Sequence, residues 1–401
     1  MNKKFIVMAA FAAMFSISFT SCSNNDDDLA GAGVAQSEAK KAITFDGYLN
    51  NIPTTRGYAA SDEDVQADGL SVWAFDATKE TAITAAADFF MGGPSAGLVH
   101  SWDGTNSYYK AAADYFWPEY ALNFVALTPQ TGGGIGAIGI SQAAAATPGS
   151  PSKPVMTVAV DVPLTTESDG SYGADTQKDI MIASSENTSA PTGFAPAPLT
   201  FKHALSQIVF KGIVDNTTTI HKAVVKSIKL VNVASNGTIT YTAATDGFAS
   251  GSLGEQNKTY AANIVHTDVT ATDAASADAI TGQADNASGR NYQLMIMPQT
   301  SKENTGVAAE NLNISCLETS PGVAPVAGTY LLVNATLYAN RNDANAVLEN
   351  TTNVYIPLES TTWEPGYKYT YLLKFGDNLL HPITFTATVA AWTDASKDVE
   401  F

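Results

Sequence analysis

The stretch that decides the fold is LTFKHALSQIVFKGIV, residues 199–214. Its apolar residues alternate with polar ones at the start and then run together, and most of them are β-branched or aromatic. Strand-length runs of the same kind, separated by Gly, Pro, Asn and Asp, recur along the whole chain, and long helical periodicity is missing. We therefore predict an all-β protein of sandwich type.

The other runs that we expect to form strands share this composition. They are residues 43–49, 70–75, 122–128, 155–162, 224–233, 238–241, 292–297, 330–338, 354–357, 367–375 and 383–392. Residues 131–154 and 267–288 are rich in small or polar residues and contain no aromatic residue. We interpret both stretches as long surface loops.

The N-terminus has the layout of an export signal, which predicts a lipoprotein. A charged start, Asn2-Lys3-Lys4, precedes an apolar stretch at residues 5–19 that is too short to span a membrane. Cys22 lies where signal peptidases that recognise lipoproteins cut, so we expect residues 1–21 to be removed and Cys22 to carry the lipid. The acidic tether after Cys22 predicts an outer-membrane lipoprotein exposed at the cell surface, held to the membrane only through the lipid.

Length and charge bound the remaining chain. About 380 of the 401 residues follow the signal, which suits two domains. A small-residue connector, Ala195-Pro196-Ala197-Pro198, divides them into residues 57–198 and 199–401. The net charge of −18 argues against nucleic acid as a partner, because binding it needs a basic face. Once Cys22 is lipidated, Cys316 is the only thiol, so we predict a buried, inert cysteine in a strand.

Two short motifs resemble catalytic or cofactor-binding signatures. The glycines of residues 134–139 match a dinucleotide-binding pattern, but only two helical turns can follow before Pro148. Residues 93–97 match the GxSxG nucleophile elbow, but a strand and a turn follow the serine instead of a helix. The five histidines show no metal-ligand spacing. We predict no enzymatic activity, no cofactor and no metal site.

Several segments in a fixed order resemble the fimbrillin family, the subunits of type V pili of anaerobic Gram-negative bacteria. Besides the lipoprotein signal they are ITFDGY at 43–48, TTRG at 54–57, LSVWAF at 70–75, YFWP at 115–118, LNFVA at 122–126, DIMIA at 179–183, FKHALS at 201–206, MPQ at 297–299, WEPGYKY at 363–369 and VAAW at 389–392. Each segment alone is weak evidence, and their order and spacing carry the resemblance, which covers nearly the whole chain.

The resemblance implies two tandem transthyretin-like Greek-key β-sandwich domains and a pilus subunit that supports adhesion. It also implies that an outer-membrane, Arg-specific protease cuts the lipidated precursor. Arg56 is the matching residue, so residues 22–56 would be a propeptide and Gly57 the new N-terminus. The implied partners are other copies of the chain or related pilins, assembled into extracellular fimbriae. The adhesion ligand is not indicated.

The first and last predicted strands suggest how the subunits join. Ile43, Phe45 and Leu49 share one face of a strand, so cutting after Arg56 would remove an apolar row and leave a sheet edge unpaired. Ile383, Phe385 and Val389 form a similar row. We hypothesise that this C-terminal strand of one subunit fills the groove of the next, in a head-to-tail contact that builds a filament.

An alternative role is a monomeric glycan-binding lipoprotein of the cell surface, in which Trp102, Tyr108 and Tyr109 form a platform that stacks on sugars. A pilus tip or anchor subunit is a further alternative, because such subunits share the fold and differ in partners. Trp73, Trp117, Trp363 and Trp392 we assign to packing, and His203 to a strand in which its hydrogen bonds are satisfied.

Overall fold

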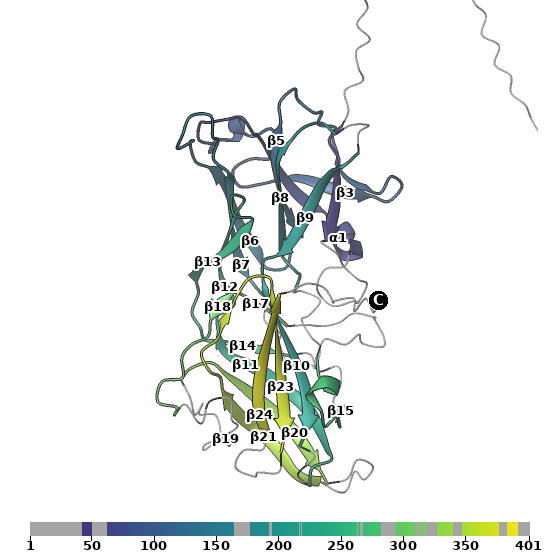
Figure 1. Ribbon diagram of the computed structural model, residues 1–401, viewed down its shortest axis with the longest axis vertical. Coiled ribbons are helices and arrows are strands. Elements are labelled where there is room, and N and C mark those ends of the chain that lie inside the picture. Colours follow the sequence, from purple (N-terminus) through teal and green to yellow (C-terminus); the bar gives the residue numbers. More distant parts are fainter. Residues whose placement is uncertain are drawn as a thin grey trace, which may run out of the picture. The chain divides into compact units, whose positions relative to one another are not determined.

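The computed structural model describes residues 42–49, 62–163, 177–191, 195–215, 217, 219–262, 264, 268–281, 294–308, 312, 316–317, 327–339, 347–376 and 383–391. They all belong to one compact unit, residues 41–401. Nearly every element in it is a β-strand (Figure 1), which confirms the all-β prediction. In the described part of the chain no helix is long and apolar enough to cross a membrane.

Seven strands form a closed barrel in the N-terminal part of the unit. Their order is β1 (Phe45–Leu49), β4 (Tyr108–Ala111), β3 (Leu98–Asp103), β2 (Leu70–Asp76), β5 (Leu122–Thr128), β8 (Met181–Thr188) and β9 (Ala197–His203), which returns to β1. All neighbours run antiparallel except β1 and β9, which are parallel. The short helices α1 (Asp62–Asp68) and η1 (Ala86–Asp88) flank β2.

The barrel has a core of its own. Phe45, Val72, Phe124 and Leu199 belong to one buried cluster, whereas Trp73 lies on the other face of β2 and belongs to a second cluster. Both faces of β2 and β5 are therefore buried, which explains why their sequences are apolar almost throughout.

A four-stranded sheet has the order β13 (Gly247–Leu253), β12 (Asn236–Thr242), β7 (Pro154–Asp161) and β6 (Ile135–Gln142), and its strands lie side by side in Figure 1. Because β6 forms within residues 131–154, the interpretation of that stretch as a surface loop was wrong. The hairpin with β7 lets glycine-rich β6 pair despite its low strand propensity.

The expected boundary between residues 198 and 199 falls inside β9, and the domain division stays a prediction.

The second expected loop, residues 267–288, also contains regular structure where it is described. It holds β15 (Asp268–Val269), η4 (Ala274–Ser276) and β16 (Asp278–Ala279). Its strands are only two residues long, and they pair with β11 (Lys222–Val233) and β10 (Ser206–Val214).

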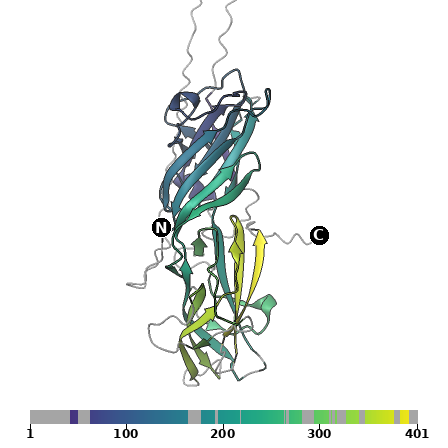
Figure 2. The same ribbon diagram turned by 90° about the vertical axis from the view of Figure 1, so that its left-hand side faces the viewer.

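The remaining strands form three sheets. One has the order β16, β10, β23 (Tyr367–Phe375) and β24 (Ile383–Ala391), with β17 (Leu294–Ile296) also paired to β10. Figure 2 shows β23 and β24 side by side in yellow. Another has the order β14 (Lys258–Ala261), β11, β20 (Tyr330–Tyr338), β21 (Val347–Pro357) and β19 (Cys316–Leu317), and β18 (Gln299–Thr300) pairs with β22 (Thr362–Trp363).

Two of the tryptophans confirm the packing role that we expected. Trp73 and Trp363 are fully buried, and their indole N–H groups donate to the Gly93 carbonyl at 2.8 Å and to the Tyr371 hydroxyl at 2.7 Å. Trp117 packs edge-on against Phe124. Trp392 lies outside the described residues.

Candidate functional site

Strand β1 closes the barrel and has a neighbour on each side. Residues 45–49 pair in parallel with residues 197–201 of β9, and Phe45 lies opposite Tyr109 of β4. Just before the strand, the Ile43 N–H donates to the Tyr115 carbonyl at 2.6 Å, and the Ala197 N–H donates to the Thr44 carbonyl at 2.8 Å. Removing β1 would therefore leave two strands with unpaired backbone groups.

The side chains of this segment are anchored in the barrel core. The Phe45 side chain is fully buried, and its ring meets those of His100 and Phe124 edge-on at centroid distances of 5.0 and 5.1 Å. Ile43 is buried in the same cluster. The expected apolar row is thus confirmed for Ile43 and Phe45, and the Leu49 side chain lies outside the described ones.

Phe45→Ala should lower the free energy of unfolding of the uncut chain by about 3–5 kcal/mol, because it removes a buried ring and leaves a cavity. Asp46→Ala changes the next residue, on the other face of the strand, and should cost less than about 1 kcal/mol. Urea unfolding of both variants measures the difference. Equal losses would mean that β1 is not held by its apolar face.

His100 lies beneath β1 as a neutral, buried imidazole. Its side chain is fully buried, Nδ1 lies 3.0 Å from the Leu98 carbonyl oxygen, and Nε2 has no hydrogen-bond partner in the described part of the chain. Burial lowers the pKa of His100 to about 4, and the Leu98 carbonyl opposes that effect only in part. We did not predict this role, although the alternation of residues 98–103 places His100 on one face with Leu98 and Trp102.

Acid should loosen the barrel through His100. Since its pKa is near 6.5 when unfolded and about 4 when folded, the stability that depends on a neutral imidazole is complete above pH 6.5 and is lost as the pH falls toward 4. The expected loss is about 2 kcal/mol at pH 5 and about 3 kcal/mol below pH 4. Urea unfolding across this range should show a flatter profile for His100→Leu.

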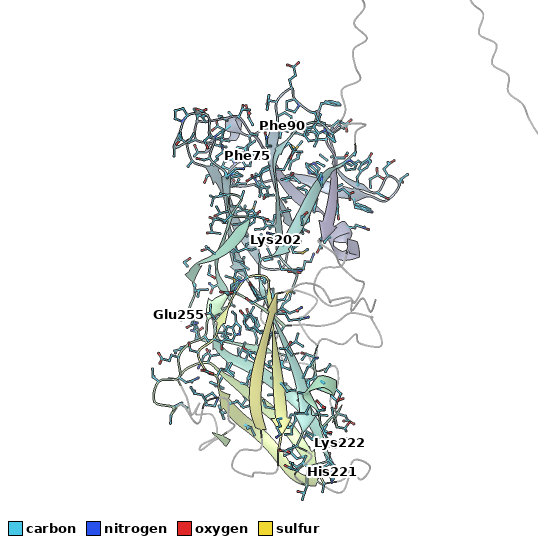
Figure 3. All side chains as sticks on the ribbon, viewed as in Figure 1. Phe75, Phe90, Lys202, His221, Lys222 and Glu255 are labelled. Atoms are coloured by element: carbon cyan, nitrogen blue, oxygen red, sulfur yellow. The ribbon has the colours of Figure 1, made fainter. Side chains whose placement is uncertain are left out.

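The matched control for this prediction is His221→Leu. His221 is exposed and lies beside Lys222 at the start of β11 (Figure 3). Its replacement removes a histidine outside the barrel, next to a strand of another sheet. A profile that flattens equally in both variants would show that His100 is not the group responsible.

The predicted donor residues Ile383, Phe385 and Val389 lie in β24. This strand pairs antiparallel with β23 over nine residues, 383–391 against 367–375, and β23 is its one neighbour within the described residues. With nine paired residues, the strand is long enough to cover the five paired residues of β1, and among the described residues it lies at the edge of its sheet. The side chains of β24 lie outside the described ones.

The three predicted processing residues, Cys22, Arg56 and Gly57, lie outside the described residues. Their place in the sequence is nevertheless informative, because Arg56 falls between the end of β1 at Leu49 and the start of α1 at Asp62. Cleavage after Arg56 would separate β1 from the rest of the chain without cutting any other described element.

The two signature-like motifs have structural explanations. Gly134 and Gly136 lie where the strand β6 begins, and a Cβ on Gly134, whose φ is +84°, would lie 1.8 Å from the Asp161 carbonyl oxygen. Ser95 lies in a turn closed by the pairing of Gly93 with Ala96, and strand β3 follows it. Within the described ranges no group of three or more His, Cys, Asp or Glu side chains could hold a metal ion.

The sugar-stacking platform of the alternative role does not form from all three of its residues. Tyr109 is only 1% exposed and meets Trp102 edge-on at 4.9 Å, so its ring packs inside the barrel and cannot face a ligand. His203 agrees with its prediction, since Nδ1 lies 2.6 Å from Oδ2 of the buried Asp179.

Comparisons with known proteins point to one family. A model of fimbrillin-like proteins matches residues 55–392. A fimbrial protein from Bacteroides vulgatus has a similar structure, with 16% identity and a TM-score of 0.52 over 88% of this chain and 99% of that one. A proposed cell adhesion protein from Bacteroides ovatus shows 15% identity and a TM-score of 0.45 over 89% and 100% of the two chains. No curated protein matches.

Proposed function

The chain belongs to the fimbrillin-like family, and we propose that it is a structural subunit of a cell-surface fimbria that supports adhesion. In this proposal Cys22 carries the lipid during export to the outer membrane. An Arg-specific protease at the cell surface then cuts after Arg56. Other copies of the chain, or related pilins, are the partners in the filament, and we propose no catalytic activity.

The observation that carries the proposal is the position of β1. It is a barrel strand with a neighbour on each side, and the chain that follows it contains Arg56 before the next described element begins at Asp62. Cutting there leaves β1 held only by non-covalent contacts. When β1 leaves, the edges of β4 and β9 and the rings of His100 and Phe124 become accessible to another strand.

The C-terminal strand of a second copy is the proposed replacement. Burying Ile383, Phe385 and Val389 in the groove would contribute about 1.5–3 kcal/mol for each side chain, before backbone pairing is counted. The contact joins two different surfaces, the groove of one subunit and the strand of another. Repetition therefore gives an open filament instead of a closed dimer.

N-terminal sequencing of protein shed from the cell surface tests the processing step. We expect the shed chains to begin at Gly57. Chains that all retain Cys22 would contradict cleavage after Arg56 and would favour an anchor subunit or a monomeric surface protein.

A further inference from the structure

The sheet of β6, β7, β12 and β13 is almost without charge. Its four strands together contain one charged residue, Asp161, in a chain whose charged residues make up 15% and whose net charge is −18. Two copies of so acidic a protein repel each other over most of their surface. A second copy can therefore approach this sheet at little electrostatic cost.

The residues along one row of the sheet are small. Gly139, Thr157, Thr240 and Ala249 are paired in register across the four strands. Gly139 and Ala249, on the two outer strands, are exposed, and the threonines between them are half-buried. No long side chain in this row would sterically hinder the backbone of a second copy that approaches the sheet.

Strand β13 is an open edge of this sheet. Within the part of the chain that the structure describes, β13 pairs with β12 alone, and residues 249–253 are exposed. The opposite edge, β6, is covered, because the Ile140 N–H donates to the Pro94 carbonyl at 3.0 Å and Ile83 pairs with Gln142. β13 contains no proline and no charged residue, two of the usual protections of an edge strand, and the one irregularity in its pairing with β12 is a register shift between Ser250 and Leu253.

We propose that β13 is a self-association edge, at which a second copy of this chain pairs antiparallel to join the two four-stranded sheets into one. Pairing centred on Ser250, the middle residue of the strand, places Phe248 opposite Ser252 and Ala249 opposite Gly251, so each larger side chain meets a smaller one. This contact uses neither the β1 groove nor β24.

The charges at the two ends of β13 are compatible with this register. Asp246 precedes the strand, forms an ion pair with Lys202, and would lie opposite Gly254 of the partner. Glu255 follows the strand and would lie opposite Thr245. The pairing therefore brings no two like charges directly opposite each other, which would oppose association.

The contact is small, so a single pair of copies should associate weakly. Seven residues of edge strand cover well under the roughly 800 Å² per partner of a stable interface, and we expect a dissociation constant on the order of 0.1 mM. If the proposed filament forms, the same edge would recur along its length, and many weak contacts would hold two filaments side by side.

Sedimentation equilibrium of the unlipidated chain from residue 23, carrying Arg56→Ala, tests the inference without strand exchange. The truncation leaves the compact unit at residues 41–401 intact. The weight-average mass should approach twice the monomer mass near 1 mM, and amide exchange at residues 247–253 should slow as concentration rises. Ala249→Lys should remain monomeric over the same range, because it places two lysines at the paired edge.

Thr105→Lys is the matched control, since it makes the same charge change at an exposed residue of the turn after β3. This variant should associate as the unchanged chain does. A monomer at every concentration, or equal association of the Ala249→Lys and Thr105→Lys variants, would overturn the inference. Slowed exchange that does not depend on concentration would also overturn it. The proposed function would stand in each case, because the test does not involve β1 or β24.

Discussion

Arg56→Ala is expected to abolish filament formation and to leave the subunit uncut and attached to its lipid. The reason is geometric: while β1 is covalently attached, the edges of β4 and β9 are already paired and Phe45 fills the barrel core. An incoming strand would have to displace a strand that remains at high effective concentration. Electron microscopy of surface filaments and the N-terminal sequence of the subunit are the two measurements.

Arg290→Ala provides the matched control, because it removes another of the three arginines at a position after the barrel strands. It should change neither processing nor filaments. Placing the recognition sequence of a site-specific protease at residues 52–56 provides a rescue, since adding that protease should restore assembly. Filaments formed by uncut Arg56→Ala subunits would show that β1 does not block assembly.

Phe385→Asp is expected to prevent polymerisation as completely as Arg56→Ala does. It changes the strand that a subunit gives, whereas Arg56→Ala keeps closed the groove that receives a strand. The substitution removes about 1.5–3 kcal/mol of apolar burial in the proposed groove and would place a carboxylate there, which costs several kcal/mol more. Thr386→Asp introduces the same charge at the neighbouring position of the strand, which alternation assigns to the other face. It should assemble nearly as well as the unchanged chain, as judged by filament yield.

Folding of the subunit has to be measured beside assembly, because β24 also pairs with β23 of its own chain. A thermal melt of each uncut variant separates loss of the fold from loss of the donor strand. Deleting residues 383–401 is the stronger form of the same experiment. Filaments assembled from the deleted chain would assign the donor to another segment.

Local sequence pattern was sufficient to predict the strands that are rich in β-branched and aromatic residues. Residues 122–128 and 367–375 were predicted with the bounds that β5 and β23 have, because β-branched and aromatic residues fill them. The glycine-rich β6 was expected to be part of a surface loop, and the small-residue strand β13 was not among the predicted strands. Glycine is depleted in strands, and both strands form by hairpin pairing with their sequence neighbours β12 and β7, which composition alone does not indicate.

The candidate site could be predicted only in part. Alternation placed Ile43 and Phe45 on one buried face, but it does not indicate which strands lie on either side of β1. The parallel pairing with β9 joins residues about 150 positions apart, and the contact of Phe45 with His100 is likewise tertiary. Tyr109 shows that sequence can also suggest a site that does not form. Its aromatic ring suits a sugar platform, but the pairing of its strand with β1 buries the ring.

The central claim is that one subunit gives a strand and the next receives it in place of β1. The two defective variants test this directly, because an uncut Arg56→Ala subunit can give a strand but not receive one. A Phe385→Asp subunit cut after Arg56 can receive a strand but not give one. Native mass spectrometry of an equal mixture, at a concentration far below the dissociation constant expected for the β13 edge, should therefore find a one-to-one complex and nothing longer, while each variant alone stays monomeric. Two variants that remain separate in the mixture, or that together form filaments, would contradict the account.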